Sequence, residues 1–401
     1  MTAALFDSPA PRVFGLPPGL PFAAALTEGL AARLAGAPPE AWGRITLYLP
    51  ARRMLRAVRD ALEARGPGLL PRLRLLSEVA LDPAWVGLPP PVPPLRRRLE
   101  LARLVGALLE KEPDLAPRAH LYDLADSLAQ LMEEMQGEGV PPAAIARLEP
   151  TDLADLSGHW ERSLRFLRIL EPWFGEGGAP EGEGRLRQVA ERLCTLWESA
   201  PPQDPVIVAG ATGAQGGARL LMEAVARLPQ GAVVLPAFDF DLPEPVWEGF
   251  DSPLTGEDHP QFRFACLLRR LGLSPRSVRP WTVREAPVPA RARLISLALR
   301  PPPVTDQWLA EGPALGDLRP ACAGLTLLEA PSPRFEAEAI AARMRDGIAR
   351  GETCALVTAD RSLARRVAAA LDRWGGWCRT TALACRSDSR RRAGSCGRWH
   401  G

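Results

Sequence analysis

Three glycines at three-residue spacing, Gly210, Gly213 and Gly216, lie in the stretch GATGAQGG. An apolar segment (206–209) precedes this stretch, a helical pattern follows it, and Asp239 comes after the next apolar segment. In dinucleotide-binding proteins, the amide groups of such a turn hold a pyrophosphate at a helix N-terminus, and the acidic residue holds a ribose. The pattern therefore allows one hypothesis, an NAD(P)-binding oxidoreductase.

Two features of the sequence do not favour that hypothesis. The turn is similar to the GATGxxGG turn of short-chain dehydrogenase relatives, but that fold begins with the motif and continues with a run of strand–helix units. Those enzymes also use a YxxxK pair, whereas neither tyrosine of this chain, Tyr48 or Tyr122, lies near its single lysine, Lys111. The oxidoreductase stays the alternative interpretation, and the glycines would otherwise serve a tight turn and close helix–strand packing.

A P-loop NTPase is the second candidate for nucleotide chemistry. It needs GxxxxGK[ST] early in an α/β layer, where the lysine contacts the phosphates and the hydroxyl contacts magnesium. Between the first apolar segment (12–16) and the helix after it, this chain has LPPGLPF, with Pro17, Pro18 and Gly19 at the position of the loop. Because this stretch contains no lysine, serine or threonine, we interpret it as a degenerate nucleotide site and expect no ATP hydrolysis.

A group of arginines gives the sequence its candidate nucleic-acid contact. In the helix expected at 52–64, apolar residues recur with a helical period on one side, and Arg52, Arg53 and Arg56 lie on the other. Arginine side chains and a helix N-terminus can both bind phosphate oxygens. A solvated helix face explains the same pattern, so both readings stay open.

The remaining chemistry-bearing residues predict no catalytic or metal site. Asp239 and Asp241 could share a metal ion, but the polar end of a strand explains them more simply. The four histidines stand apart along the sequence, as helix-surface or capping residues do. We therefore expect neither a catalytic residue nor a metal ligand in this chain.

Apolar segments that alternate with helical patterns predict an α/β fold. From 95 to 200 the period is helical throughout, which indicates an all-helical insertion inside an α/β domain. A further strand–helix–strand–helix pattern starts at 325, with TLLEA and CALVTAD as its strands. The strands of the main sheet are expected at 12–16, 44–49, 206–209 and 232–236, with a further strand and turn within 69–79.

The composition excludes several classes of protein. The chain has 401 residues, 46% of them hydrophobic, and a formal net charge of only +2, so it can form sizeable cores but is not a strongly basic protein. No apolar run is long enough to span a membrane, and the N-terminus lacks the features of a signal peptide, so we expect a cytoplasmic location. Four cysteines are expected to be buried free thiols: Cys194, Cys266, Cys322 and Cys354.

The last stretch of the sequence, 376–401, differs from what precedes it. It has no periodicity, and its three cysteines do not have the spacing of metal ligands. A disordered basic tail is one explanation. We favour another, a frameshifted end, because the composition changes in the middle of an α/β unit.

Several stretches, taken in order over residues 12–375, resemble AddB of the alphaproteobacterial type. AddB is the second subunit of the bacterial AddAB helicase–nuclease, which processes double-strand breaks. No single stretch is decisive, but the ordered set is specific, and the resemblance stops at Gly376. The stretches are VFGLPPGLPFAAALTEGLAARL, ITLYLPARRMLRAVRDAL, LLPRLRLLSEV, PVIVAGATGAQGGARLLMEAVARLPQGAVVLPAFD, HPQ (259–261) and ALVTADRSLARRVAAALDRWG.

The resemblance implies a superfamily-1-like helicase module that has lost its motor chemistry. LPPGLPF stands where such helicases have their phosphate loop. YLPARRMLRAV stands where motif Ia contacts single-stranded DNA, which makes Arg52 and Arg53 the expected backbone contacts. In the family, the partner AddA uses ATP, and the magnesium-dependent nuclease is a C-terminal domain of AddB that these residues do not include.

The resulting expectation is a DNA-holding scaffold for double-strand break repair and recombination, without enzymatic activity or a cofactor of its own. Its partners would be an AddA-type subunit and single-stranded or tailed double-stranded DNA, with no membrane. The domains are expected to be a first half of a RecA-like domain (1–94), a helical insertion (95–200), the second half (201–300), the start of a second RecA-like domain (320–375) and an aberrant tail (376–401).

Overall fold

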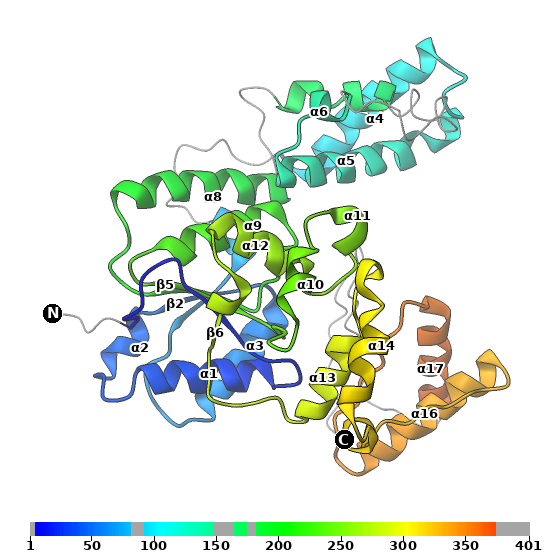
Figure 1. Cartoon of the computed structure of the whole chain (residues 1–401). Helices are drawn as coiled ribbons and strands as arrows, with labels where there is room; N and C mark the ends of the chain where they lie inside the picture. The colour runs from blue at the N-terminus through cyan, green and yellow to red at the C-terminus, as the bar shows by residue number, and fades with distance from the viewer. Residues whose placement is uncertain (1–4, 82–91, 147–163, 175–181, 374–401) are drawn as a thin grey trace, which may run out of the picture. The chain divides into compact units, whose positions relative to one another are not determined.

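A parallel sheet of six strands organises the larger part of the chain (Figure 1). The computed structural model describes residues 5–81, 92–146, 164–174 and 182–373. The sheet is open, its strand order is β3-β2-β4-β5-β1-β6, and every neighbouring pair is parallel, so the expected α/β fold is confirmed. The strands are β1 (Val13–Gly15), β2 (Thr46–Leu49), β3 (Arg72–Leu75), β4 (Val206–Ala209), β5 (Gly231–Leu235) and β6 (Arg279–Pro280).

The central strands β4 and β5 are buried along their whole length. Their side chains alternate between the two faces, so that Val206 and Val208 pack on one side and Ile207 and Ala209 on the other. Strands with both faces covered read as continuous apolar runs, which is why VIVA and AVVL could be recognised in the sequence. Strand β2 begins two residues later than expected, because a short helix, α2 (Glu40–Arg44), precedes it.

Helices cover both faces of the sheet (Figure 1). One face packs against α1 (Phe22–Arg33) and α3 (Arg52–Glu63). The opposite face packs against α8 (Gly182–Ser199), α9 (Gly216–Arg227) and α12 (Phe262–Leu271). The helices expected after the first, second and fourth strands are therefore confirmed.

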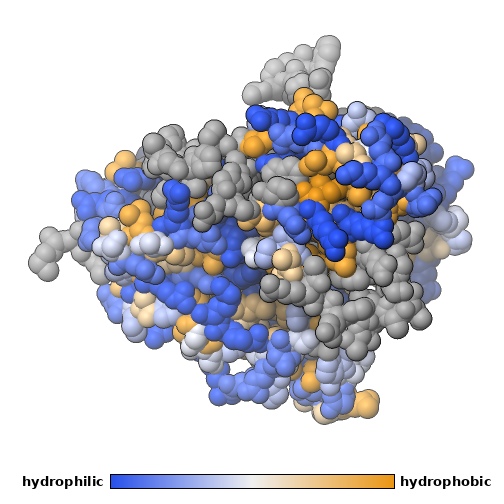
Figure 2. Space-filling view, turned by 90° about the horizontal axis from the view of Figure 1, so that it is seen from above, coloured by the Kyte–Doolittle hydropathy of each residue, from blue (hydrophilic) through white to orange (hydrophobic). Residues whose placement is uncertain are grey.

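The expected helical insertion lies between β3 and β4 in the sequence. It has its own core, in which Leu101, Val105 and Met132 are buried. Its elements are α4 (Pro94–Lys111), α5 (Leu121–Glu138), α6 (Pro142–Ala146) and a helical stretch at 164–168, and it leads into α8. Within the helical period expected from 95 to 200, residues 147–163 and 175–181 lie outside the described part. From above, the described surface is mostly hydrophilic, with hydrophobic atoms gathered in patches (Figure 2).

The proline-rich region after β5 contains short helices that the sequence did not reveal. They are α10 (Glu244–Glu248), α11 (Pro253–Gly256), α13 (Pro289–Ala298), α14 (Gln307–Glu311) and α15 (Arg319–Cys322). The edge strand β6 in the same region leads into Trp281, whose indole nitrogen donates to the Leu26 carbonyl over 2.9 Å. The indole lies so close to α1 that a Cβ at Gly29 would come within 2.4 Å of it. This contact closes the edge of the sheet against α1.

The chain divides into two compact units, Met1–Ala321 and Cys322–Gly401. The described part of the second unit contains α16 (Pro333–Ala349) and α17 (Arg361–Arg373), which pack on each other through Ala341, Val367 and Leu371. The strands expected at TLLEA and CALVTAD are wrong: neither segment pairs with a strand, and Leu327 and Val357 are 87% and 94% exposed. A strand is stabilised by hydrogen bonds to a neighbouring strand, and the described part of this unit supplies none. The tail at 376–401 lies outside the described residues.

Two further sequence expectations concern membranes and thiols. Among the described residues, no helix is long and apolar enough to cross a membrane.

The four cysteines are free, as expected, but the sequence prediction overestimated their burial. Cys322 is exposed, and the other three are only partly covered.

Candidate nucleic-acid interface

The predicted degenerate nucleotide site lies at the carboxyl end of β1. Strand β1 leads to α1 on one face, whereas its neighbour β5 leads to helices on the other face, and ligands of open α/β sheets bind in the crevice where such strands meet. Pro17, Pro18 and Gly19 form a turn at this point, and Gly19 has a φ of +87°. The sheet thus brings these residues to the position where a phosphate loop would be required.

Aromatic side chains lie against the end of β1, beside this turn. A Cβ added to Gly15, the last residue of β1, would lie 2.7 Å from Phe238 and 2.9 Å from the ring of Phe240. The two rings pack edge to face with their centroids 4.9 Å apart, and the Phe238 amide donates to the Leu16 carbonyl over 2.8 Å. The space beside the turn is therefore occupied by the protein's own side chains.

The glycine turn after β4 packs against side chains from α1 and α3. Gly210 and Gly213 have φ values of +77° and +70°, which confirms that they serve a tight turn. A Cβ at Gly210 would lie 3.1 Å from the Phe22 ring and 3.5 Å from the Met54 methyl group. Phe22 and Met54 begin α1 and α3, so apolar side chains from both helices lie against this turn.

Two other glycines of the turn, Gly216 and Gly217, allow the helices to approach closely. A Cβ at Gly216 would come within 2.3 Å of the Gly137 carbonyl oxygen, and one at Gly217 within 2.8 Å of the Arg187 backbone nitrogen. The sequence predicted helix–strand packing for these glycines. The structure corrects this expectation: they pack on α5 and α8, and the end of α5 covers the start of α9.

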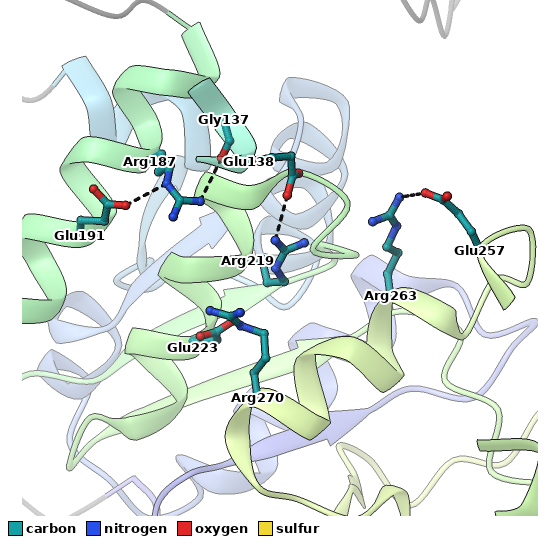
Figure 3. Close-up of polar contacts among 9 residues, drawn as sticks. All are labelled: Gly137, Glu138, Arg187, Glu191, Arg219, Glu223, Glu257, Arg263 and Arg270. Atoms are coloured by element: carbon teal, nitrogen blue, oxygen red, sulfur yellow. Dashed lines mark hydrogen bonds and ion pairs between the residues drawn. The ribbon is translucent and has the colours of Figure 1, made fainter. Parts of the chain in front are cut away.

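Charged contacts secure the same junction (Figure 3). Arg219 of α9 pairs with Glu138 at the end of α5 over 2.9 Å, and Arg187 of α8 donates to the Gly137 carbonyl over 3.4 Å. A carboxylate near the start of a helix is stabilised by the helix dipole. The N-terminus of α9, where a pyrophosphate would have to bind, thus already has an acidic partner from α5.

The predicted DNA contacts lie on α3 and are exposed. We call Arg52, Arg53, Arg56 and Arg59 the α3 arginine surface, and all four side chains face solvent. Val58 and Leu62 anchor the opposite side of the helix in the core. Arg59, which was not among the predicted contacts, joins the surface because Arg52, Arg56 and Arg59 follow one another by four and three residues along one side of the helix.

The α3 arginine surface is not neutralised by the rest of the described chain. Among described residues, no carboxylate lies within ion-pair distance of its four guanidinium groups, although Asp60 and Glu63 lie on the same helix. The arginines drawn in Figure 3 behave differently, since Arg219, Arg263 and Arg270 each pair with a glutamate. The α3 arginine surface thus keeps its hydrogen-bond donors available for an external anion.

The two aspartates after β5 stabilise a turn. The Asp239 carboxylate accepts from the Asp241 amide over 2.9 Å, and the Asp239 amide donates to the Gln261 side chain over 3.1 Å. Burial raises the pKa of Asp239, while a hydrogen bond from Ser296 lowers it. Among the described residues, no group of three or more His, Cys, Asp or Glu side chains could hold a metal ion.

His259 lies beside this turn and is buried. Its Nδ1 accepts from the Gln261 amide over 3.1 Å, and its ring packs on Phe250 with the centroids 4.8 Å apart. Burial, with a smaller contribution from the Arg300 charge, lowers the pKa of His259 from 6.5 to about 4. The sequence predicted a surface or capping residue, and the structure corrects this to a buried one.

A pH dependence of stability follows from His259. The unfolded chain binds a proton below about pH 6.5, whereas the folded chain binds it only near pH 4, so the free energy of unfolding falls as the pH decreases through this range. The slope from this residue is at most about 1.4 kcal/mol per pH unit. Urea denaturation of wild type and His259→Asn, which keeps an acceptor for Gln261, should show a flatter pH profile for the variant; parallel profiles would contradict the assignment.

The sequence matches no family model, and it matches no curated protein.

Proposed function

We propose that this chain is a DNA-holding, non-catalytic helicase-like module. The observation that carries the proposal is the α3 arginine surface, with four exposed guanidinium groups that no described carboxylate neutralises. Arginines bind phosphate oxygens through paired N–H donors, and such contacts position a protein on nucleic acid without reading its sequence. Ligand binding at this surface would therefore be electrostatic and independent of sequence.

The absence of motor activity is the second part of the proposal. The turn at Pro17–Gly19 has no lysine or hydroxyl group for a nucleotide and magnesium, and Phe238 and Phe240 lie against Gly15 at the end of β1. Lys111, the single lysine, lies in the last turn of α4, in the helical insertion. These features support a module that binds DNA without hydrolysing ATP.

The assignment to an AddB-type subunit depends on the ordered set of stretches described above. An open parallel sheet with a helical insertion is compatible with a RecA-like domain, which is the fold that the resemblance implies. In this proposal an AddA-type partner supplies the ATP-driven motor, and the chain holds single-stranded or tailed DNA during double-strand break repair. The second unit would be the start of another RecA-like domain, represented here by its two helices.

The oxidoreductase alternative receives no support from the geometry of the glycine turn. The end of α5 covers the start of α9, and Glu138 provides the negative charge there. Titration of NADPH fluorescence with the chain tests this alternative directly. Saturable binding of NADPH would support the oxidoreductase alternative.

A plain interaction module built on the helical insertion is the other alternative. One observation favours it, an apolar groove of about 370 Å³ on the insertion. The groove is lined by Leu124, Ser127, Leu128, Leu131, Ile145, Phe166 and Leu167. This reading would gain if alanine at Arg52 and Arg53 left DNA binding unchanged while partner binding persisted.

Fluorescence anisotropy with a labelled tailed duplex tests the proposal. We expect the purified chain to bind in the absence of nucleotide, weakly alone and more tightly with an AddA-type subunit. The affinity should not change when ATP is added to the chain alone, and no phosphate should be released. Magnesium-dependent ATP turnover by the chain would contradict the inactive-motor part, and no DNA binding in either state would contradict the rest.

A further inference from the structure

The second unit contains another pair of arginines that no described residue neutralises. Arg365 and Arg366 lie in the second turn of α17, and both side chains are exposed. Neither has a hydrogen bond, ion pair or ring contact with any other described residue. Val367, Ala370 and Leu371 form the side of the helix that packs against α16. Arg365 lies opposite this side, and Arg366 lies beside it, one helical turn before Ala370.

Other arginines of the same unit have carboxylate partners. Arg334 pairs with Glu338 over 3.1 Å, and Arg373, at the end of α17, approaches the same carboxylate at 3.3 Å. Arg343 pairs with Asp346 over 3.4 Å. The chemistry of this unit therefore favours intramolecular pairing of arginines, and Arg365 and Arg366 differ from these neighbours.

The pair has the same arrangement as the beginning of the α3 arginine surface. In both helices two consecutive exposed arginines lie within the first two turns, and the helix is anchored by buried residues further along it. Consecutive helical residues point about 100° apart, so two adjacent guanidinium groups can bind two different phosphates. A single carboxylate ligand would engage only one of them.

We propose that Arg365 and Arg366 form a second contact for the phosphate backbone of nucleic acid, located in the second unit. The class of ligand rests on the proposed function, because the α3 arginine surface is assigned to the same ligand. Each unit then contributes one helix with phosphate contacts. Neither contact reads a base, so the second one is also independent of sequence.

The test compares Arg365→Ala/Arg366→Ala with wild type in the full chain. The probe is a labelled oligothymidylate single strand, and dissociation constants are measured by anisotropy over a series of salt concentrations. Losing two phosphate contacts should weaken binding roughly tenfold at low salt and reduce the slope of log K against log salt by about 1.4, since each single-strand contact contributes about 0.7. Circular dichroism and thermal unfolding verify that the variant is folded.

The matched control is Arg334→Ala/Arg343→Ala, which removes the same charge from the same unit but from ion-paired arginines. It should bind nearly as wild type does. Equal losses in the two double variants would overturn the proposal, because net charge alone would then explain the effect. A third outcome is that the wild type binds and the α3 variants lose affinity, whereas Arg365→Ala/Arg366→Ala binds as the wild type does. That result would overturn the second contact but not the proposed function. A wild-type chain that binds neither alone nor together with an AddA-type subunit overturns the proposed function as well.

Discussion

Replacing Arg52, Arg53 and Arg56 together by alanine should weaken DNA binding roughly 100-fold at low salt. The estimate assumes that each lost phosphate contact costs about 1 kcal/mol, which is modest for a charge-assisted hydrogen bond. The fold should survive, because all three side chains are exposed and Val58 and Leu62 still anchor α3. Anisotropy with a tailed duplex measures the effect, and thermal unfolding verifies the fold.

A control for this variant removes three exposed arginines that already have partners. Arg96, Arg118 and Arg276 pair with glutamates over 2.8, 3.1 and 2.7 Å. Their replacement by alanine lowers the net charge of the chain equally but should change the affinity only a few-fold. Should the control lose as much affinity as the α3 variant, the location of the arginines on α3 would be irrelevant and the interface would be wrongly placed.

Gly216→Ala should destabilise the chain by about 3 kcal/mol, a large effect for one methyl group. The added Cβ would lie 2.3 Å from the Gly137 carbonyl oxygen and 3.1 Å from the Glu138 Cα. Both are backbone atoms, so α5 or α9 must move, which also lengthens the Arg219–Glu138 ion pair. Urea denaturation monitored by circular dichroism measures the loss.

The same substitution in α4 provides the comparison. Gly106→Ala places its Cβ no closer than 3.7 Å to any other atom, the Leu121 methyl group. Alanine is preferred to glycine inside a helix by roughly 0.5–1 kcal/mol, so this variant should be slightly more stable than wild type. If Gly216→Ala were as stable as Gly106→Ala, close packing would not explain the glycine, and a ligand-binding turn would regain support.

The sequence predicted the main sheet well because its central strands are buried on both faces. VIVA and AVVL are continuous apolar runs, and both became strands within one residue of the expected bounds. TLLEA and CALVTAD look similar in composition but are not strands in the structure. An apolar run in the sequence indicates that a segment can form a strand. The strand also needs a neighbouring strand to pair with, and the run itself gives no information about that neighbour.

The short helices after β5 could not be predicted for a different reason. Helices of four or five residues, such as α10, α11 and α14, are too short to show a period, and the region is rich in proline. The edge strand β6 spans two residues. These elements are fixed by contacts such as that between Trp281 and Gly29, which join segments far apart in the sequence.

The candidate interface was predictable in its residues but not in its electrostatics. The helical period placed Arg52, Arg53 and Arg56 outside the core, and the structure agrees. Whether an exposed arginine is neutralised depends on carboxylates from other segments, as Arg219 and Glu138 illustrate. The lack of a carboxylate partner for the arginines of α3 could therefore be recognised only from the three-dimensional structure.

The roles of the glycines in GATGAQGG were only partly accessible. Gly210 and Gly213 follow from local backbone geometry, which a motif can encode. Gly216 and Gly217 instead depend on the approach of α5 and α8, which the motif does not indicate. The segment GATGAQGG therefore suggests a nucleotide site when only the sequence is considered, whereas in the structure it forms a junction between helices.

The salt dependence of DNA binding tests the central claim, that the α3 arginine surface holds a phosphate backbone, most directly. Dissociation constants of a tailed duplex are measured over a salt series for wild type and for Arg52→Ala/Arg53→Ala/Arg56→Ala. We expect the slope of log K against log salt to be shallower in the variant by about 2 to 3, because each contact contributes roughly 0.7 to 0.9. Identical slopes would contradict it.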